Sequence, residues 1–377
     1  MDAREFLRGL DTLHVDFYTG VPDSLLKPLN DTLLADYGLT DRHIVAANEG
    51  AAVGLAAGHY IATGRPALVY MQNSGVGNAV NPIASLLDER VYGIPCVFVV
   101  GWRGEPGVKD EPQHAFQGLI TKEMLELMNL RVFELTKTTD AAAFAAMLAQ
   151  CGSELAKGRS VAFLAHKGSL TGDAKPAIEN DRRLKREDAL REILSQTRPE
   201  DVFVSTTGKT SREVFELRKA LQQNHDQDFL TVGSMGHASM IALGIAKAKP
   251  ERVVWCLDGD GAALMHMGGL AIEAEQRNRN MIHVLLNNGA HESVGGMPVA
   301  GGGLWFAPLA RAAGCEAVFT AESAKELSAL LPRVRDAAKT KLCFLEIMLQ
   351  QGSRDDLGRP TQTPKENLRA LMQALSE

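Results

Sequence analysis

The chain has 377 residues, of which 45% are hydrophobic, and this is typical of a globular protein with two domains. Its net charge of −6 and pI near 6.0 argue against a nucleic-acid-binding surface. No apolar stretch approaches the roughly 20 residues that a membrane-spanning helix needs, and the charged amino terminus lacks the apolar core of a signal peptide. The five cysteines are scattered without paired spacing, which favours core positions over metal or redox roles. We therefore expect a cytoplasmic protein that binds neither membrane nor nucleic acid.

The first half of the chain alternates short apolar segments with segments of helical pattern. The expected strands are 43–47, 67–71 and 96–100, and the expected helices between them are 50–62 and 78–87. This alternation predicts a mostly parallel, doubly wound sheet. Residues 171–188 are rich in Gly, Pro and charge, which predicts a linker.

A second alternation follows the predicted linker. The expected helices are 190–195, 211–222, 238–248 and 262–276, and the expected strands are 202–206, 229–232, 253–257 and 281–286. We therefore expect an α/β protein of two doubly wound parallel-sheet domains, 1–180 and 181–377, without a middle domain.

Two polar turns follow neighbouring strands of the second half, Gly259-Asp260-Gly261 and Asn287-Asn288. The carboxyl ends of parallel strands meet at one sheet edge, so Asp260 and Asn288 are expected to lie close together. Their oxygens suit a hard cation such as Mg²⁺, and the helix that opens at Gly261 favours a diphosphate. Either adjacent amide could bind the ion, and a plain acidic turn of a Rossmann-like sheet is the alternative interpretation.

The segment 233–239 also follows an expected strand and opens a helix. The backbone N–H groups of Gly233 and Ser234 are therefore candidates for phosphate contacts. Met235 is either a core residue, the usual role of methionine, or a residue that touches the cofactor, and the two roles are compatible.

A glutamate, Glu49, follows an expected strand of the first half and precedes a helix of small residues. A buried carboxylate needs a partner, and burial would raise its pKa toward proton-holding values. The alternative is an ordinary acid at a helix start, stabilised by the helix dipole.

The Gly- and Pro-rich loop 101–117 follows a buried strand, where binding residues concentrate. Arg103 and Lys109 could hold an anion, and His114 could transfer or orient a proton near neutral pH. The alternative is a solvated loop with an incidental histidine.

These motifs resemble those of a known family. Gly-Asp-Gly followed by Asn-Asn resembles the thiamine diphosphate signature, and Asn-Glu-Gly-Ala-Ala around Glu49 resembles the segment that contacts the cofactor's aminopyrimidine ring. Further segments similar to those of phosphonopyruvate decarboxylases are 19–24, 70–75, 101–107, 110–114, 291–296 and 352–360. The resemblance runs from about Thr19 to Pro360, and it extends to the compact, two-domain layout of these decarboxylases.

The resemblance implies a thiamine diphosphate cofactor anchored by Mg²⁺. The implied metal ligands are Asp260, Asn288 (favoured over its neighbour) and the carbonyl of Ala290. Glu49 would share a proton with the aminopyrimidine ring and so help to form the carbon nucleophile. Met235 would hold the cofactor in a bent shape. The implied contacts to the cofactor are made by Glu49, Gly233, Ser234, Met235, Gly259, Asp260, Gly261 and Asn288.

The resemblance also implies a substrate and a reaction. The substrate would be 3-phosphonopyruvate, a 2-keto acid that carries a phosphonate, and the products phosphonoacetaldehyde and carbon dioxide. Asp23 and His114 are candidate proton carriers. Besides Arg103 and Lys109, the basic residues Arg354 and Arg359 are candidates for binding the anionic substrate, although an exposed basic tail would explain the last two equally well.

Three other functions compete with this hypothesis. Sulfopyruvate decarboxylases share the cofactor and several motifs, but the fused chain and the sequence of residues 102–106 favour a phosphonate substrate. A non-catalytic assembly protein would need none of Glu49, Asp260 and Asn288. A dinucleotide-dependent enzyme would need a Gly-x-Gly-x-x-Gly turn, which the sequence lacks. The resemblance further implies a homo-oligomer, with Glu49 of one chain and Asp260 of another at each cofactor.

Overall fold

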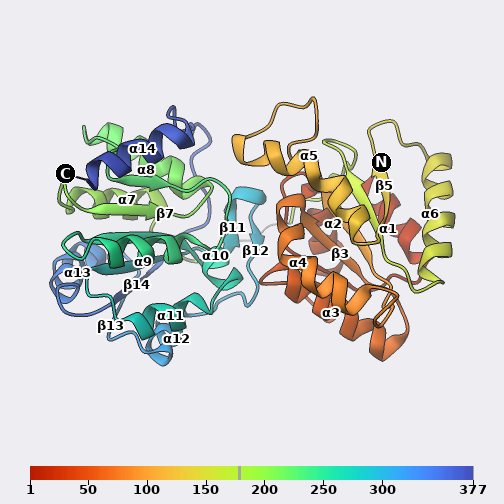
Figure 1. The fold of residues 1–377 in the computed structure, drawn as a ribbon, viewed down its shortest axis with the longest axis horizontal. Coiled ribbons are helices and arrows are strands. Elements are labelled where there is room, and N and C mark those ends of the chain that lie inside the picture. The colour runs from red at the N-terminus through yellow and green to blue at the C-terminus, as the bar shows by residue number, and fades with distance from the viewer. Residues whose placement is uncertain (177–179, 377) are drawn as a thin grey trace. The chain divides into compact units, whose positions relative to one another are not determined.

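The computed structural model describes residues 1–176 and 180–376. These form two compact units, Met1–Ile178 with Met297–Ala300, and Glu179–Gly296 with Gly301–Glu377 (Figure 1). Each unit contains one six-stranded parallel sheet. The predicted α/β fold with two parallel-sheet units is therefore confirmed. No helix in the described parts of the chain is long and apolar enough to cross a membrane.

The sheet of the first unit has the strand order β2-β1-β3-β4-β6-β5. Its strands are β1 (Tyr18–Gly20), β2 (His43–Val45), β3 (Leu68–Gln72), β4 (Val97–Gly101), β5 (Arg131–Leu135) and β6 (Val161–Ala165), and β12 (Met297–Pro298) is a separate short strand. Its helices are α1 (Ala3–Asp11), α2 (Lys27–Tyr37), α3 (Glu49–Thr63), α4 (Val76–Pro82), α5 (Pro112–Leu127) and α6 (Ala141–Leu155), with short helical turns η1 (Asn73–Gly75) and η2 (Ile83–Leu87).

Helices cover both faces of this sheet, which explains why its strands are apolar throughout. Along β4, Val97 and Val99 pack into the core beneath α1, α2 and α6. Phe98 and Val100 pack into the core beneath α3, α4 and α5. A parallel strand that is buried on both faces carries a continuous apolar run rather than an alternating one.

The sheet of the second unit has the order β13-β14-β10-β9-β7-β8. Its strands are β7 (Val202–Ser205), β8 (Asp228–Leu230), β9 (Val254–Gly259), β10 (Met281–Asn287), β13 (Ala317–Ala321) and β14 (Cys343–Met348), and β11 (Ala290–His291) is a separate short strand. Its helices are α7 (Arg186–Ser195), α8 (Lys209–Ala220), α9 (Ala238–Ala248), α10 (Asp260–Met265), α11 (Gly269–Gln276), α12 (Phe306–Ala313), α13 (Ala324–Ala337) and α14 (Pro364–Ala374), with the turn η3 (Glu292–Val294).

Two predicted boundaries in the second half are wrong. Helix α7 begins at Arg186, inside the predicted linker, because the guanidinium is buried against Glu213 with Nε–Oε2 and Nη2–Oε1 distances of 2.7 and 2.9 Å. The predicted single helix 262–276 is two helices, since His266 leaves helical geometry just before Gly268 and Gly269. Residues 177–179 of the predicted linker lie outside the described residues.

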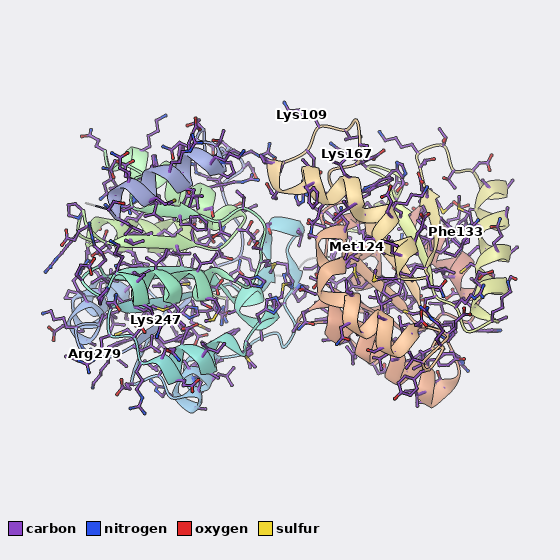
Figure 2. All side chains as sticks on the ribbon, viewed as in Figure 1. Lys109, Met124, Phe133, Lys167, Lys247 and Arg279 are labelled. Carbon is purple, nitrogen blue, oxygen red and sulfur yellow. The ribbon has the colours of Figure 1, made fainter. Side chains whose placement is uncertain are left out.

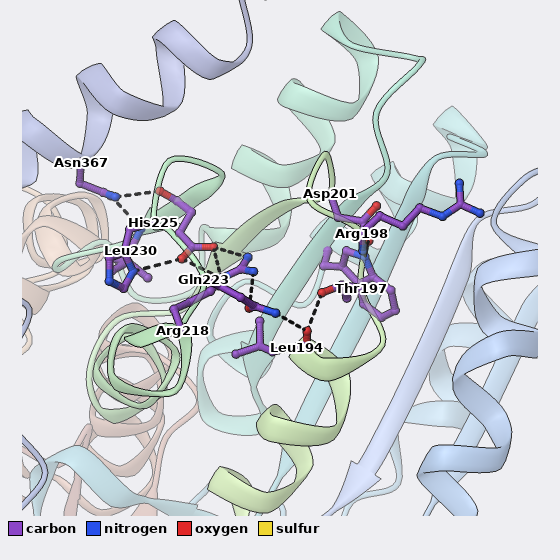
Figure 3. A network of polar contacts seen from close by, with 11 residues as sticks. Leu194, Thr197, Arg198, Asp201, Arg218, Gln223, His225, Leu230 and Asn367 are labelled. Carbon is purple, nitrogen blue, oxygen red and sulfur yellow. Dashed lines mark hydrogen bonds and ion pairs between the residues drawn. The ribbon is translucent and has the colours of Figure 1, made fainter. Parts of the chain in front are cut away.

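The carboxy-terminal helix α14 is fastened to the edge strand β8. The Asn367 side chain donates to the Asp228 carbonyl at 2.8 Å and accepts from the Leu230 N–H at 3.0 Å (Figure 3). The Asp228 carboxylate is itself paired with the buried Arg218, at 2.7 Å from Nη2. Asn367 thus bonds to β8 as a neighbouring strand would.

Candidate functional site

Polar residues collect at the carboxyl ends of four neighbouring strands of the first unit. Strands β2, β1, β3 and β4 are adjacent and parallel. Glu49 follows β2, Asp23 follows β1, Gln72 ends β3 and Arg103 follows β4. This sheet edge is where open α/β folds bind ligands.

Glu49 is the first residue of α3, whose start is capped by Asn48 through a 2.8 Å bond from the Ala51 N–H. The Glu49 side chain is 4% exposed, and its Oε2 accepts a 2.8 Å hydrogen bond from Asn78 Nδ2. Burial raises the pKa of this carboxyl group, while the Asn78 bond opposes the rise. The other oxygen packs on Gly75, where an added Cβ would lie 2.1 Å from Oε1. The position therefore favours a carboxyl that holds or shares a proton.

Asp23 is the second buried acid of this edge and has no solvent exposure. Its carboxylate accepts from Gln72 Nε2 at 2.6 Å and from the Leu25 N–H at 3.0 Å. Burial raises the pKa of Asp23, and the Gln72 bond and the charge of Arg103 act in the opposite direction. A proton on Asp23 is therefore favoured relative to an exposed aspartate.

Arg103 is held within its own loop. Its Nε lies 2.8 Å from Asp110 Oδ2, and a second ion pair joins Nη2 to Asp110 Oδ1. The remaining nitrogen, Nη1, donates to Ser24 Oγ at 3.1 Å, and its backbone is bonded in both directions by the Asn73 amide. Asp110 thus satisfies one edge of the guanidinium, which leaves Nη1 facing the turn that contains Ser24.

The other two predicted residues of this loop differ in burial. His114, on α5, is 7% exposed, and its Nδ1 has no hydrogen-bond partner among the described residues. Burial, and then the charge of Arg103, lower the pKa of His114 and keep its imidazole neutral. Lys109 is exposed on the loop before α5 (Figure 2). The structure therefore groups His114 with the buried residues and leaves Lys109 outside that group.

In the second unit, Asp260 and Asn288 lie at the ends of the adjacent parallel strands β9 and β10. Asp260 is 3% exposed, with Oδ1 accepting from the Gly261 N–H at 2.8 Å and Oδ2 from the Gly289 N–H at 2.6 Å. Burial raises the pKa of Asp260 to about 7, against the opposing effect of these two bonds. The predicted approach of the two turns is thus seen directly in the Asp260–Gly289 bond.

The two adjacent amides have different surroundings. Asn287 donates from Nδ2 to the buried Glu346 at 2.7 Å and accepts from Arg182 at its Oδ1 at 3.1 Å. Asn288 donates to Glu292 at 3.0 Å, and its Oδ1 accepts from the Ala290 N–H at 3.1 Å. The Asn287 side chain is committed to the core, whereas Asn288 stays in the polar turn beside Asp260.

The segment 233–236 has the backbone geometry of an anion-binding turn. Gly233, Ser234 and Gly236 have φ values of 68°, 47° and 84°. The Gly233 N–H donates to Thr207 Oγ1 at 3.0 Å, and Met235 is half-buried. Successive N–H groups in such turns form concave anion sites.

The two arginines predicted near the carboxyl terminus are not equivalent. Arg354 lies 3.2 Å from Glu187 and 3.1 Å from Asp356, and it forms a third ion pair with Glu216. Arg359 is exposed. Three carboxylates already neutralise Arg354, so its guanidinium is less available to an anionic ligand than the sequence indicated. Its role in binding the substrate stays a prediction.

A buried ion-pair cluster lies behind the Gly-Asp-Gly turn. His283 on β10 is 2.9 Å from Glu273 and 3.7 Å from Asp258, which in turn accepts from the Gly259 N–H at 2.9 Å. The two carboxylates outweigh the effect of burial and raise the pKa of His283 to about 10. Cys256 lies in the same group, and all five cysteines are buried and free.

Sequence reasoning missed three residues that hold the predicted ones in place. Gln72, Asn78 and Asp110 bond to Asp23, Glu49 and Arg103 respectively. The only signal for Gln72 and Asp110 was that both lie within segments 70–75 and 110–114, which resembled the family. Asn78 lay inside an expected helix and carried no signal.

Comparison with known proteins places the chain in a family. The N-terminal TPP binding domain of thiamine pyrophosphate enzymes matches residues 3–125, and the C-terminal TPP binding domain matches residues 206–347. A phosphonopyruvate decarboxylase of Streptomyces viridochromogenes is 36% identical over 97% of this chain and 92% of its own length. A second, from Streptomyces hygroscopicus, is 33% identical over 100% of this chain and 94% of its own.

The chain belongs to the phosphonopyruvate decarboxylase family. The predicted thiamine diphosphate fold and the predicted carboxy-lyase class are thereby confirmed. A sulfopyruvate decarboxylase of Methanosarcina acetivorans is a more distant relative, 28% identical over 64% of this chain and 65% of its own length. Both TPP binding domains are matched within this one chain.

The residues present fit the groups that this family requires. The carboxylate of Asp260, the amide oxygen of Asn288 and the backbone carbonyl of Ala290 form an all-oxygen donor set, which suits Mg²⁺. In the turn 233–236 the Gly233 N–H is bonded to Thr207 Oγ1, so the Ser234 N–H is the better candidate for a diphosphate contact. The metal and each residue's contact with the cofactor stay predictions.

Proposed function

We propose that this protein decarboxylates 3-phosphonopyruvate to phosphonoacetaldehyde and carbon dioxide with thiamine diphosphate and Mg²⁺. The observation that carries the proposal is the buried Glu49 carboxyl, which has a raised pKa and accepts a hydrogen bond from the Asn78 side chain. Two phosphonopyruvate decarboxylases that are similar over nearly the whole chain support the substrate.

Thiamine diphosphate, when bound, supplies the carbon nucleophile and the electron sink for decarboxylation. The chain itself supplies proton control. Glu49 holds a proton against the cofactor's pyrimidine, because burial makes the charged carboxylate unfavourable. Asp260, Asn288 and the Ala290 carbonyl would hold Mg²⁺, which would supply positive charge for the diphosphate.

The reaction replaces the substrate's carboxylate with a proton at the same carbon. Asp23 and His114 are the proposed carriers of that proton. Asp23 holds one more readily than an exposed aspartate. Burial lowers the pKa of His114, and its Nδ1 has no hydrogen-bond partner in the part of the chain that the structure describes. Both lie near Arg103, whose Nη1 edge is bonded to Ser24 Oγ rather than to Asp110 and offers a cation for the substrate's carboxylate.

Oligomerisation is part of this proposal. The small residues of α3 include Gly54 and Gly58, which have no neighbouring atom within 4 Å of an added Cβ. Such a bare helix face allows the close approach of a second chain. Size-exclusion chromatography with light scattering tests this, and a fully active monomer would contradict it.

The decisive experiment measures carbon dioxide release from phosphonopyruvate and sulfopyruvate by the wild type and Glu49→Gln. We expect the wild type to prefer phosphonopyruvate. We expect the variant to release carbon dioxide from it at least about a hundredfold more slowly. A preference for sulfopyruvate would keep the reaction and overturn the substrate. Absence of thiamine diphosphate binding, measured by calorimetry, would overturn the whole proposal.

A further inference from the structure

Lys209 lies at the same sheet edge as the predicted metal ligands. It is the first residue of α8 and follows β7 through the turn 206–208, in which Gly208 has φ 96°. Strand β7 lies between β8 and β9 in the parallel sheet. The turn therefore adjoins the segment after β8, to which it is bonded by the Gly233 N–H and Thr207 Oγ1 at 3.0 Å.

The Lys209 side chain reaches the segment after β14. Its ammonium donates to Ser353 Oγ at 2.5 Å. The preceding residue, Gly352, donates its N–H to Glu292 at 2.8 Å, and the same Glu292 oxygen accepts from Asn288 at 3.0 Å. Three short contacts thus connect Lys209 to the candidate metal ligand within one unit.

Hydroxyl groups accompany the ammonium. The turn at Gly208 packs on Ser293, whose Cβ and Oγ lie 3.2 and 3.4 Å from the position of an added Cβ. Ser293 is exposed, and Ser353 is half-buried. The ammonium is bonded to one hydroxyl, and a second hydroxyl, on Ser293, lies beside the residue that precedes Lys209. Ammonium and hydroxyl groups are donors that suit an oxyanion.

The charge of Lys209 is not matched by a carboxylate. Within residues 1–176 and 180–376, the ion pairs of the second unit include Arg354 with three acids but none to Lys209. The charge of Lys209 acts to lower the pKa of Glu213, but the Glu213 carboxylate is already paired with Arg186 at 2.7 Å. A half-buried ammonium with only a hydroxyl partner is available to an anion.

We propose that Lys209, with Ser353 and Ser293, binds the phosphonate of the substrate and selects dianionic substrates over other 2-keto acids. The proposal rests on the proposed function. A lysine interacts with a phosphoryl dianion as a flexible point charge, and a sulfonate with one charge less gains less from it. The cofactor's diphosphate has the same chemistry, so the test separates the two phosphoryl groups.

The test uses the holoenzyme with three variants, Lys209→Ala, Lys209→Arg and Lys219→Ala. Lys219 is an exposed lysine near the end of the same helix, about 15 Å away, and serves as the matched control. The probe is 3-phosphonopropionate, which lacks the keto group and is not decarboxylated. Its Kd and that of thiamine diphosphate are measured by calorimetry, alongside kcat and KM for phosphonopyruvate.

For Lys209→Ala we expect the Kd of 3-phosphonopropionate and the KM to rise by about 10- to 100-fold, with the Kd of thiamine diphosphate within about twofold. Lys209→Arg should retain most of the binding, and Lys219→Ala should match the wild type. A higher Kd for thiamine diphosphate with an unchanged Kd for 3-phosphonopropionate would assign Lys209 to the diphosphate and overturn the proposal. Unchanged Kd values for both ligands, or no probe binding by the wild type, would also overturn it.

The failure of the proposed function gives a different result. If the wild type binds 3-phosphonopropionate through Lys209 but does not decarboxylate phosphonopyruvate, the phosphonate site stands and the reaction falls. If it decarboxylates phosphonopyruvate while Lys209→Ala leaves KM and probe binding unchanged, the reaction stands and the site falls.

Discussion

Replacing Gly75 by alanine tests whether the position of the Glu49 carboxyl controls activity. A Cβ at this position would lie 2.1 Å from Glu49 Oε1 and 2.5 and 2.6 Å from its Cδ and Cγ. Ordinary contacts between such atoms need well over 3 Å, so the carboxyl must move by about 1 Å or more. The backbone of Gly75 has φ −79° and ψ −14°, which alanine adopts without strain.

The expected consequence is a loss of activity without a loss of folding. A displacement of about 1 Å in a catalytic group lowers the rate by on the order of a hundredfold, equivalent to roughly 2.7 kcal/mol in the activation barrier. Carbon dioxide release and the exchange of the cofactor's C2 proton should fall together, because the proposed function assigns both to Glu49. Circular dichroism and thiamine diphosphate binding should change little.

Gly77→Ala is the matched control for this prediction. Gly77 lies two residues away in α4, and an added Cβ there meets no atom within 4 Å. Alanine in the first turn of α4 is compatible with the helix and displaces no described atom, so Gly77→Ala should keep its activity. If Gly75→Ala retained full activity, the dependence of catalysis on this carboxyl position would be refuted.

Three further predictions concern the second unit. His283→Gln should lower the free energy of unfolding by up to about 5 kcal/mol below pH 6.5, because the folded-state pKa is about 10. This difference should shrink as the pH rises through about 10, and a pH-independent loss in urea titrations would contradict it. Asn288→Ala should lower the affinity for Mg²⁺ in cofactor-binding titrations by at least about tenfold, as expected for a lost ligand. An unchanged affinity would show that Asn288 is not a metal ligand. Asn287→Ala should instead cost about 1–3 kcal/mol of stability, because Glu346 loses a buried donor, and urea unfolding checks this.

The sequence predicted the fold and the proximity of the Gly-Asp-Gly and Asn-Asn turns because the signals for both are local. Apolar runs bounded by glycine turns identify buried parallel strands. The rule that ligands bind at the carboxyl ends of such strands then brings Asp260 and Asn288 together without any coordinates. The Asp260–Gly289 bond at 2.6 Å shows that this reasoning was sound.

Interactions that tertiary contacts decide could not be read from the sequence. The charge of Arg186 indicated a linker. In the structure the Arg186 side chain is buried in an ion pair with Glu213, and helix α7 begins at Arg186. Arg354 has the composition of an anion-binding residue, yet acids from two helices and its own loop surround it. A charged side chain carries no mark of whether its partner is a ligand or another part of the protein.

The bonding of Asn367 to β8 bears on how the protein prevents another chain from adding a strand to this sheet edge. An edge strand offers unpaired N–H and C=O groups on which a second chain can add a strand. The Asn367 amide occupies one carbonyl and one N–H of β8, at Asp228 and Leu230, and α14 packs against the same strand. Proteolytic removal of α14 would therefore expose the edge of β8 together with the apolar surface that Leu371 covers. The truncated protein should then aggregate more readily than the intact chain.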